Sequence, residues 1–282
     1  MAIFDLLSHG FIQRALIAGS FIAILCAILG TFLVLRRFSL IGDGLAHVTF
    51  GGVAVGLFLR FYPMYVAVPI VMLSSLGILK LVEKARVYGD AAIGIVSSLG
   101  ISVGILLASA AGGFNIDLFS YLFGNILAIS NAEVVTSILL SVVLIVIISL
   151  FYHELLAITF DEESAKATGV RTKTINTILV LLTSLTVVLA MRVVGIMLIS
   201  ALLILPPVTA LQLTKGFRKT IFTASLAGVL SVVLGVFVSF MADLPAGATI
   251  VVVNFLFFVC SFAINIGKHR FSDRDHDKVK AV

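Results

Sequence analysis

The stretch FIQRALIAGSFIAILCAILGTFLVLRR, residues 11–37, is almost entirely apolar and ends at a pair of arginines. Its apolar run, from Phe11 to Leu35, is long enough to cross the hydrocarbon of a bilayer as an α-helix, which takes about 20 residues. The run is too long for a signal peptide and lacks a cleavage-type end. We therefore expect a membrane-spanning helix here, followed at once by a basic loop.

The same pattern recurs along the 282 residues, of which 61% are hydrophobic and 12% charged. A soluble domain of this size could not bury so much apolar surface. Because backbone polar groups must be satisfied within the bilayer, the repeated runs predict an all-α integral membrane protein, a polytopic bundle of about eight to nine transmembrane helices. The runs that we interpret as spans are 12–35, 44–61, 64–82, 91–110, 132–151, 173–191, 195–213, 220–241 and 247–266.

The basic residues lie in alternate loops. If the N-terminus is outside, all but three of the 19 Lys and Arg residues fall on the inner side, the exceptions being Arg14, Arg60 and Arg192. This asymmetry predicts an outer N-terminus and a cytoplasmic C-terminus. It also accounts for the net charge of +5, so we expect membrane lipid and no nucleic acid as a partner.

Two segments depart from a plain span. Residues 112–130, GGFNIDLFSYLFGNILAIS, are apolar but interrupted by Asn, Asp and Gly, which indicates an outer re-entrant or interfacial piece. The run 195–213 carries Pro206 and Pro207, so we expect it to be broken or kinked, with a non-helical part buried in the bundle. The domain prediction is a transmembrane domain over 1–267 and a flexible, polar cytoplasmic tail over 268–282.

Asp43 and His47 form the most suggestive polar pair, within SLIGDGLAHVTFGGVAVG, residues 39–56. At i and i+4 they share one helix face and could hold one ion. An Asp oxygen and a His nitrogen suit a first-row divalent cation. The other interpretation stays open at this point: Asp43 would cap the helix and His47 would be a hydrogen-bonded packing residue.

The inner loop AITFDEESAKATGVRTK, residues 157–173, loses the apolar pattern. Asp161, Glu162 and Glu163 favour a helix N-terminus, Ala165 lies within the short helix, and Gly169 stands where that helix would end. We interpret the segment as a short cytoplasmic helix that docks a soluble partner. An ordinary solvated loop is the alternative.

The other polar or reactive residues give weaker evidence of function. Cys26 and Cys260 fall inside apolar runs and are interpreted as packing residues. Asp5 and His9 form a second i, i+4 pair, on an exposed end. The motif HELLA at His153 lacks the second histidine of H-E-x-x-H, so we reject an intramembrane metalloprotease. No G-x-x-x-x-G-K-[ST] phosphate loop occurs, so any ATP-driven step needs another subunit, and we do not expect the chain to be an enzyme.

Four stretches, in order, resemble the membrane permease subunits of ABC-type zinc and manganese importers, the ABC-3 family. LVLRRFSLIGDGLAHVTFGGVAVG is similar to the family signature, and LFSYLFGNIL to its outer-side motif. FDEESAKATGV stands where the family has its coupling helix, and VVGIMLISALLILPPVTALQL resembles its broken late span. The resemblance covers nearly the whole chain.

This resemblance implies a homodimer of permease chains in a bacterial cell membrane, two ATP-binding subunits below it and an extracytoplasmic metal-binding protein above. It assigns metal contacts to Asp43 and His47, and ATPase coupling to Asp161, Glu162, Glu163, Ala165 and Gly169. It places an outer gate at Asp117, Phe119, Leu122 and Asn125. No permanently bound cofactor is expected, only the transported ion.

The sequence Leu45-Ala46-His47 resembles the zinc members of the family more than the manganese members. The resemblance therefore favours Zn²⁺, with Mn²⁺ and Fe²⁺ as alternatives. A secondary carrier driven by an ion gradient is the alternative function. Such a carrier should have more buried acidic groups and recognisable repeats in its two halves, which this sequence lacks.

Overall fold

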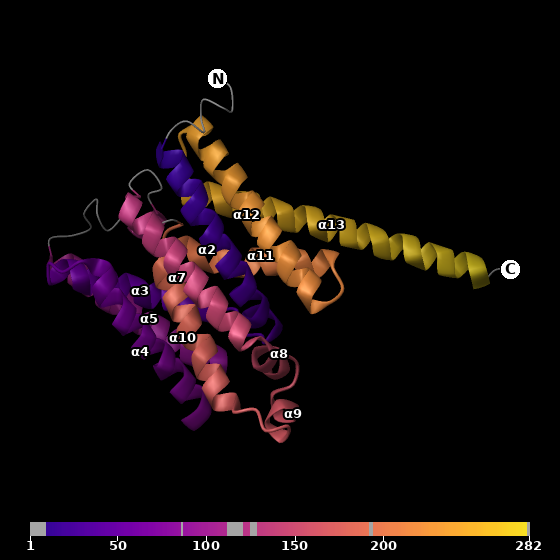
Figure 1. The fold of residues 1–282 in the computed structure, drawn as a ribbon, viewed down its shortest axis with the longest axis horizontal. Helices are drawn as coiled ribbons and strands as arrows, with labels where there is room; N and C mark the ends of the chain where they lie inside the picture. Colours follow the sequence, from indigo (N-terminus) through magenta and orange to yellow (C-terminus); the bar gives the residue numbers. More distant parts are fainter. Residues whose placement is uncertain (1–9, 86, 112–120, 125–128, 192–193, 281–282) are drawn as a thin grey trace.

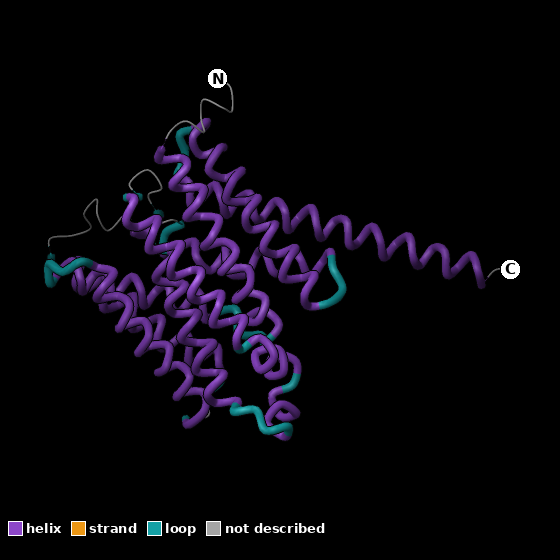
Figure 2. Tube along the Cα trace, viewed as in Figure 1, coloured by secondary structure: helices purple, strands orange, loops and turns teal. Residues whose placement is uncertain are grey.

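Long apolar runs become helices because only an internally hydrogen-bonded backbone is stable in hydrocarbon. The computed structural model describes residues 10–85, 87–111, 121–124, 129–191 and 194–280, and over these residues it is helical, without strands (Figures 1 and 2). The helices are α2 (Gly10–Leu35), α3 (Ile41–Phe58), α4 (Pro63–Lys84), α5 (Gly89–Ala110), α7 (Asn131–Leu150), α8 (Tyr152–Phe160), α9 (Glu162–Ala167), α10 (Thr172–Ala190), α11 (Ile199–Leu213), α12 (Phe217–Ala242) and α13 (Ala246–Lys280), with a 3₁₀ turn at Ile196–Leu198.

Eight of these described helices are long and apolar enough to cross a membrane, which confirms the predicted fold class. They are α2, α3, α4, α5, α7, α10, α12 and the part of α13 from Ala246 to Ile266. The remaining predicted span, 195–213, contains α11, which has only 15 residues. At 1.5 Å per residue α11 rises about 22 Å, less than the roughly 30 Å of hydrocarbon.

The late span is interrupted, but not where the prolines suggested. α11 runs without a break through Pro206 and Pro207. The interruption comes earlier, at Gly195, whose φ of 94° is one that residues with a side chain rarely adopt, and at the 3₁₀ turn that follows it, in which Ile196 is buried. Prolines remove donors to the carbonyls four residues before them. The Leu203 carbonyl, which Pro207 leaves free, lies directly against Gly30 of α2.

The two ends of the bundle gather the loops as the sequence predicts. At one end, the close of α2, the close of α4, α9 and the start of α10 meet around one cavity. At the other, the start of α2, Gly124 and the α12–α13 turn line a second cavity. In Figure 1 the second end is uppermost and α9 lies at the bottom. Which end faces the cytoplasm stays a prediction from the basic residues.

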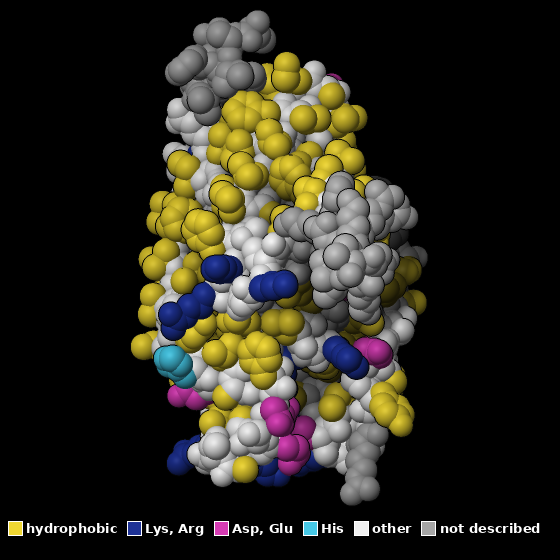
Figure 3. All heavy atoms as spheres, turned by 90° about the vertical axis from the view of Figure 1, so that its right-hand side faces the viewer, with side chains coloured by type: hydrophobic (Ala, Val, Ile, Leu, Met, Phe, Trp, Pro, Cys, Tyr) yellow, Lys and Arg dark blue, Asp and Glu magenta, His cyan; other side chains and the backbone are white. Residues whose placement is uncertain are grey.

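α2, α3 and α10 form the enclosed centre, and α4, α5, α7, α12 and α13 surround them with exposed apolar side chains. Figure 3 shows hydrophobic side chains over much of one face, with Asp and Glu side chains gathered toward the lower end. This distribution is expected where lipid is the solvent. α13 stays helical to Lys280 and extends away from the bundle (Figure 1), so the boundary at 267 and the flexibility of the tail stay predictions.

The cysteines are both free. Cys26 is fully buried in α2, as expected of a packing residue. Cys260 is exposed on α13, so the packing role predicted for it is wrong. Asp5 and His9 lie outside the described residues.

Candidate metal site and coupling helix

The first two turns of α3 present Asp43 and His47 on one face. Asp43 lies in the first turn, where a negative charge is favoured by the helix dipole. No side chain caps this helix, and Asp43 makes no hydrogen bond to its backbone in the part of the chain that the structure describes. The capping interpretation of Asp43 is therefore wrong.

The two side chains are close but not hydrogen-bonded. His47 Nε2 lies 3.5 Å from Asp43 Oδ2, longer than a good hydrogen bond. The side chain of His47 is 22% exposed and that of Asp43 is 51% exposed. Nδ1 of His47 is buried and meets no hydrogen-bond partner among the described residues. A packing histidine should be hydrogen-bonded, so this imidazole is better suited to bind a ligand than to support the core.

Glycines hold this part of α3 tightly against α5. The position that a Cβ of Gly100 would occupy is 2.7 Å from Val48 Cα and 3.0 Å from the His47 carbonyl oxygen. A Cβ on Gly51 would in turn lie 2.6 Å from the Gly100 carbonyl oxygen. Small residues let membrane helices approach to backbone contact. The glycine-rich run after His47 therefore fixes the ligand-bearing turn against a neighbouring helix.

A single chain offers two ligands at this site. Among the residues that the structure describes, no group of three or more His, Cys, Asp or Glu side chains could hold a metal ion. The half-exposed Asp43 places the pair at the surface of the chain rather than in a closed chamber. A metal ion held by this pair would need further ligands from outside the described residues of a single chain.

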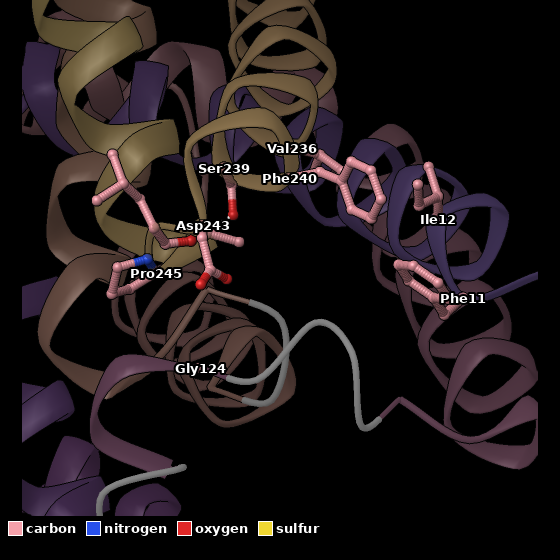
Figure 4. Close-up of a pocket in the computed structure, with 10 residues that line it drawn as sticks. Phe11, Ile12, Gly124, Val236, Ser239, Phe240, Asp243 and Pro245 are labelled. Atoms are coloured by element: carbon pink, nitrogen blue, oxygen red, sulfur yellow. Dashed lines mark hydrogen bonds between the residues drawn. The ribbon is translucent and has the colours of Figure 1, made fainter. Parts of the chain in front are cut away.

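The cavity at the end of the bundle opposite α9 does not include this pair. It measures about 510 Å³ and is lined by Phe11, Ser239, Asp243 and Pro245 among others (Figure 4). Asp243 ends α12 in a left-handed conformation and is exposed, as expected of an outer-loop residue. Of the predicted gate residues, Leu122 is buried. Asp117, Phe119 and Asn125 lie outside the described residues, so the gate stays a prediction.

The predicted coupling segment does form a helix, α9. Asp161 caps it, because Oδ1 accepts hydrogen bonds of 3.1 Å from the backbone N–H groups of Glu163 and Ser164. Ala165, within this helix, is buried. Gly169, at φ 91°, ends it, and the Gly169 and Val170 N–H groups bond back to the carbonyls of Lys166 and Ala165. The solvated-loop alternative is wrong, while docking of a partner stays untested.

Sequence reasoning missed what Glu162 does. Its carboxylate is not free for a partner, because it pairs with Arg36 Nη2 at 2.7 Å and accepts a hydrogen bond from Asn176 Nδ2 at 2.8 Å. Arg36 was interpreted only as a topology residue, and Asn176 was not singled out. Arg36 lies 126 residues from Glu162 in the sequence and Asn176 lies 14 residues from it. No local pattern predicts contacts between residues so far apart.

Comparisons with known proteins agree with this architecture. The family model described as the ABC 3 transport family matches residues 8–265. The manganese transport system membrane protein MntC of Halalkalibacterium halodurans is 35% identical over 92% of this chain and 88% of its own. A probable iron transport system membrane protein of Haemophilus influenzae is 33% identical, covering 91% and 94%. The structure of PsaBC from Streptococcus pneumoniae in complex with Fab matches with a TM-score of 0.83 and 34% identity, covering 92% of this chain and 94% of that one.

Proposed function

The chain belongs to the ABC 3 transport family of metal permeases, and on that premise we propose that it conducts Mn²⁺ into the cell as the membrane subunit of an ATP-driven importer. It is a multi-pass membrane protein. The alternative of a secondary carrier finds no support. The observation that carries the proposal is the Asp43–His47 pair, with its buried, unpartnered His47 Nδ1.

The donor set alone admits several ions. A carboxylate oxygen and an imidazole nitrogen can bind Mn²⁺, Fe²⁺ or Zn²⁺, and selection depends on geometry and availability. Manganese or iron stands in the names of the relatives above. For that reason we put Mn²⁺ first, and the zinc preference inferred from Leu45-Ala46-His47 stays a prediction that the same experiment decides.

The assembly follows from the incomplete ligand set. A second copy of the chain, related by a twofold axis, would bring its own Asp43 and His47 to the ion. Such a site offsets the cost of placing a divalent charge in a low-dielectric path. It must also release the ion, so binding should be transient. The chain has no phosphate loop, and we infer that ATP-binding subunits dock on α9 while an extracytoplasmic protein delivers the metal.

The test is metal uptake by cells that lack their own high-affinity importer, supplied with this chain, its ATPase and its binding protein. Asp43→Ala and His47→Ala should abolish Mn²⁺ uptake while the membrane level and ATPase copurification stay unchanged. Asp90→Ala, in the first turn of α5, and His153→Ala, on the exposed side of α8, are the matched controls and should transport normally. Zn²⁺ uptake that exceeds Mn²⁺ uptake would overturn the assignment of Mn²⁺ as the substrate. Normal uptake by both site variants would overturn the assignment of Asp43 and His47 as the metal site.

A further inference from the structure

Three side chains from separate segments close a ring of hydrogen bonds at the α9 end of the bundle. Arg36 Nη1 donates to Asn176 Oδ1 at 2.6 Å, and Arg36 Nη2 donates to Glu162 Oε2 at 2.7 Å. Asn176 Nδ2 donates to Glu162 Oε1 at 2.8 Å. We call Arg36, Glu162 and Asn176 the triad. Each member contacts both of the others, so none can move alone without breaking two interactions.

Two members of the triad, Arg36 and Asn176, are enclosed, whereas the Glu162 side chain is 42% exposed. The Arg36 side chain is 16% exposed, and Asn176 is buried. Burial lowers the pKa of Arg36 below its ordinary value, whereas the charge of Glu162 and the hydrogen bond to it act in the opposite direction. Removing the Glu162 carboxylate would leave a poorly solvated guanidinium on Arg36 without its counter-charge. The three segments are therefore held together as one unit.

One side of the triad belongs to the coupling helix. Glu162 is the first residue of α9, directly after its cap Asp161. Hydrogen bonds at both ends stabilise this six-residue helix. A force applied to α9 by a docked subunit thus reaches Glu162 without being absorbed within the helix.

The other side belongs to the corner that leads into the metal-bearing helix. Arg36 is the first residue after α2, and α3 begins at Ile41. Backbone bonds tighten this corner: the Phe38 N–H bonds the Leu33 carbonyl at 2.9 Å, and the Ile41 N–H bonds the Phe38 carbonyl at 3.2 Å. A displacement of Arg36 is therefore passed to the start of α3, where Asp43 lies two residues further on.

There is also room for such a displacement. A cavity of about 230 Å³ borders all three members of the triad, and its opposite wall includes Leu79, Val82 and Glu83 near the end of α4. Tight packing would resist a shift of the triad, but on this side it meets open space. The triad can move toward α4 without displacing the core.

We propose that the triad is the mechanical link by which movement of α9 reaches Asp43 and His47, which makes Arg36 and Asn176 positioning residues for transport. This inference rests on the proposed function, which identifies the subunit that moves α9 as an ATP-binding subunit. Nucleotide-driven movement of α9 pulls Glu162, the triad carries Arg36 with it, and the first turn of α3 rotates or shifts to change the metal site.

The experiment uses the full complex in proteoliposomes, with ATP hydrolysis and Mn²⁺ uptake measured on the same sample. Glu162→Gln keeps the side-chain shape and removes the charge. We expect the Mn²⁺ taken up per ATP hydrolysed to fall at least tenfold, with hydrolysis and assembly retained. Arg36→Glu combined with Glu162→Arg should recover more coupling than either single variant. The control, Glu83→Gln, removes a carboxylate from the same cavity that makes no ion pair with Arg36.

A second readout does not depend on which metal is carried. In the wild-type complex, a non-hydrolysable ATP analogue should change backbone hydrogen exchange in both α9 and the 36–47 segment. In Glu162→Gln the change in α9 should remain and the change in 36–47 should be lost. An unchanged response of 36–47, an unchanged uptake-to-hydrolysis ratio, or equal loss of assembly in all variants without recovery in the swapped pair would overturn the link. Absence of Mn²⁺ uptake by the wild type, with the exchange response intact, would overturn only the proposed function.

Discussion

Replacing Gly100 by alanine tests whether backbone contact between α3 and α5 positions the metal site. The new Cβ would stand 2.7 Å from Val48 Cα, so the two helices must separate by about 0.7 Å to reach an ordinary contact of 3.4 Å. The atoms in the way are backbone and cannot rotate aside. Overpacking of this kind costs about 2–3 kcal/mol, and the better helix propensity of alanine returns about 1 kcal/mol. The variant should lose about 1–2 kcal/mol of stability.

The separation falls at Val48, next to His47. A functional constellation tolerates displacements of about 0.5 Å, so we expect metal uptake to fall even in the fraction of protein that folds. Thermal unfolding of the purified chain should show a Tm lower by about 3–6 °C. Gly77→Ala in α4 is the matched control, because its Cβ would meet nothing within 4 Å. Equal Tm and equal uptake in the two variants would refute the reasoning.

Two further substitutions probe the ends of the bundle. Asp161→Ala removes the cap of α9 and should cost about 1 kcal/mol of local helix stability; we expect faster hydrogen exchange in α9 and weaker copurification of the ATPase, and unchanged exchange would contradict the capping role. Gly195→Ala forces a side chain into a backbone conformation that costs about 1–3 kcal/mol and against the backbone of Phe123. Uptake and Tm should both fall, and wild-type Tm and uptake in this variant would contradict the strain assigned to Gly195.

Features set by local physics were predictable from the sequence. The spans follow from the length of apolar runs, since the bilayer fixes how many residues a helix needs. α9 follows from its cap Asp161 and its terminator Gly169, which are local signals. The proximity of Asp43 and His47 could be predicted because i, i+4 spacing alone puts both residues on one helix face.

Features set by distant contacts were not predictable. The hydrogen bond between Arg36 and Asn176 joins residues 140 positions apart, and nothing near either residue marks it. The break in the late span was placed at the prolines, the strongest local breakers. It lies instead at Gly195, whose positive φ of 94° favours glycine, while α11 continues through both prolines with the Leu203 carbonyl packed against Gly30.

The exposure of the site bears on how many chains are needed to build it. Asp43 is 51% exposed in the single chain, and a carboxylate that faced the hydrocarbon of the bilayer would be costly. The side chain must therefore face water or protein in the assembled transporter. In the assembly that we propose, a second copy turned by a twofold axis would satisfy both needs, since it would cover Asp43 with protein and supply a matching aspartate and histidine. The same proposed arrangement would tie the site to the triad. Each chain's α9 would displace its own Asp43–His47 pair, and the shared ligand set would open if the two chains moved apart.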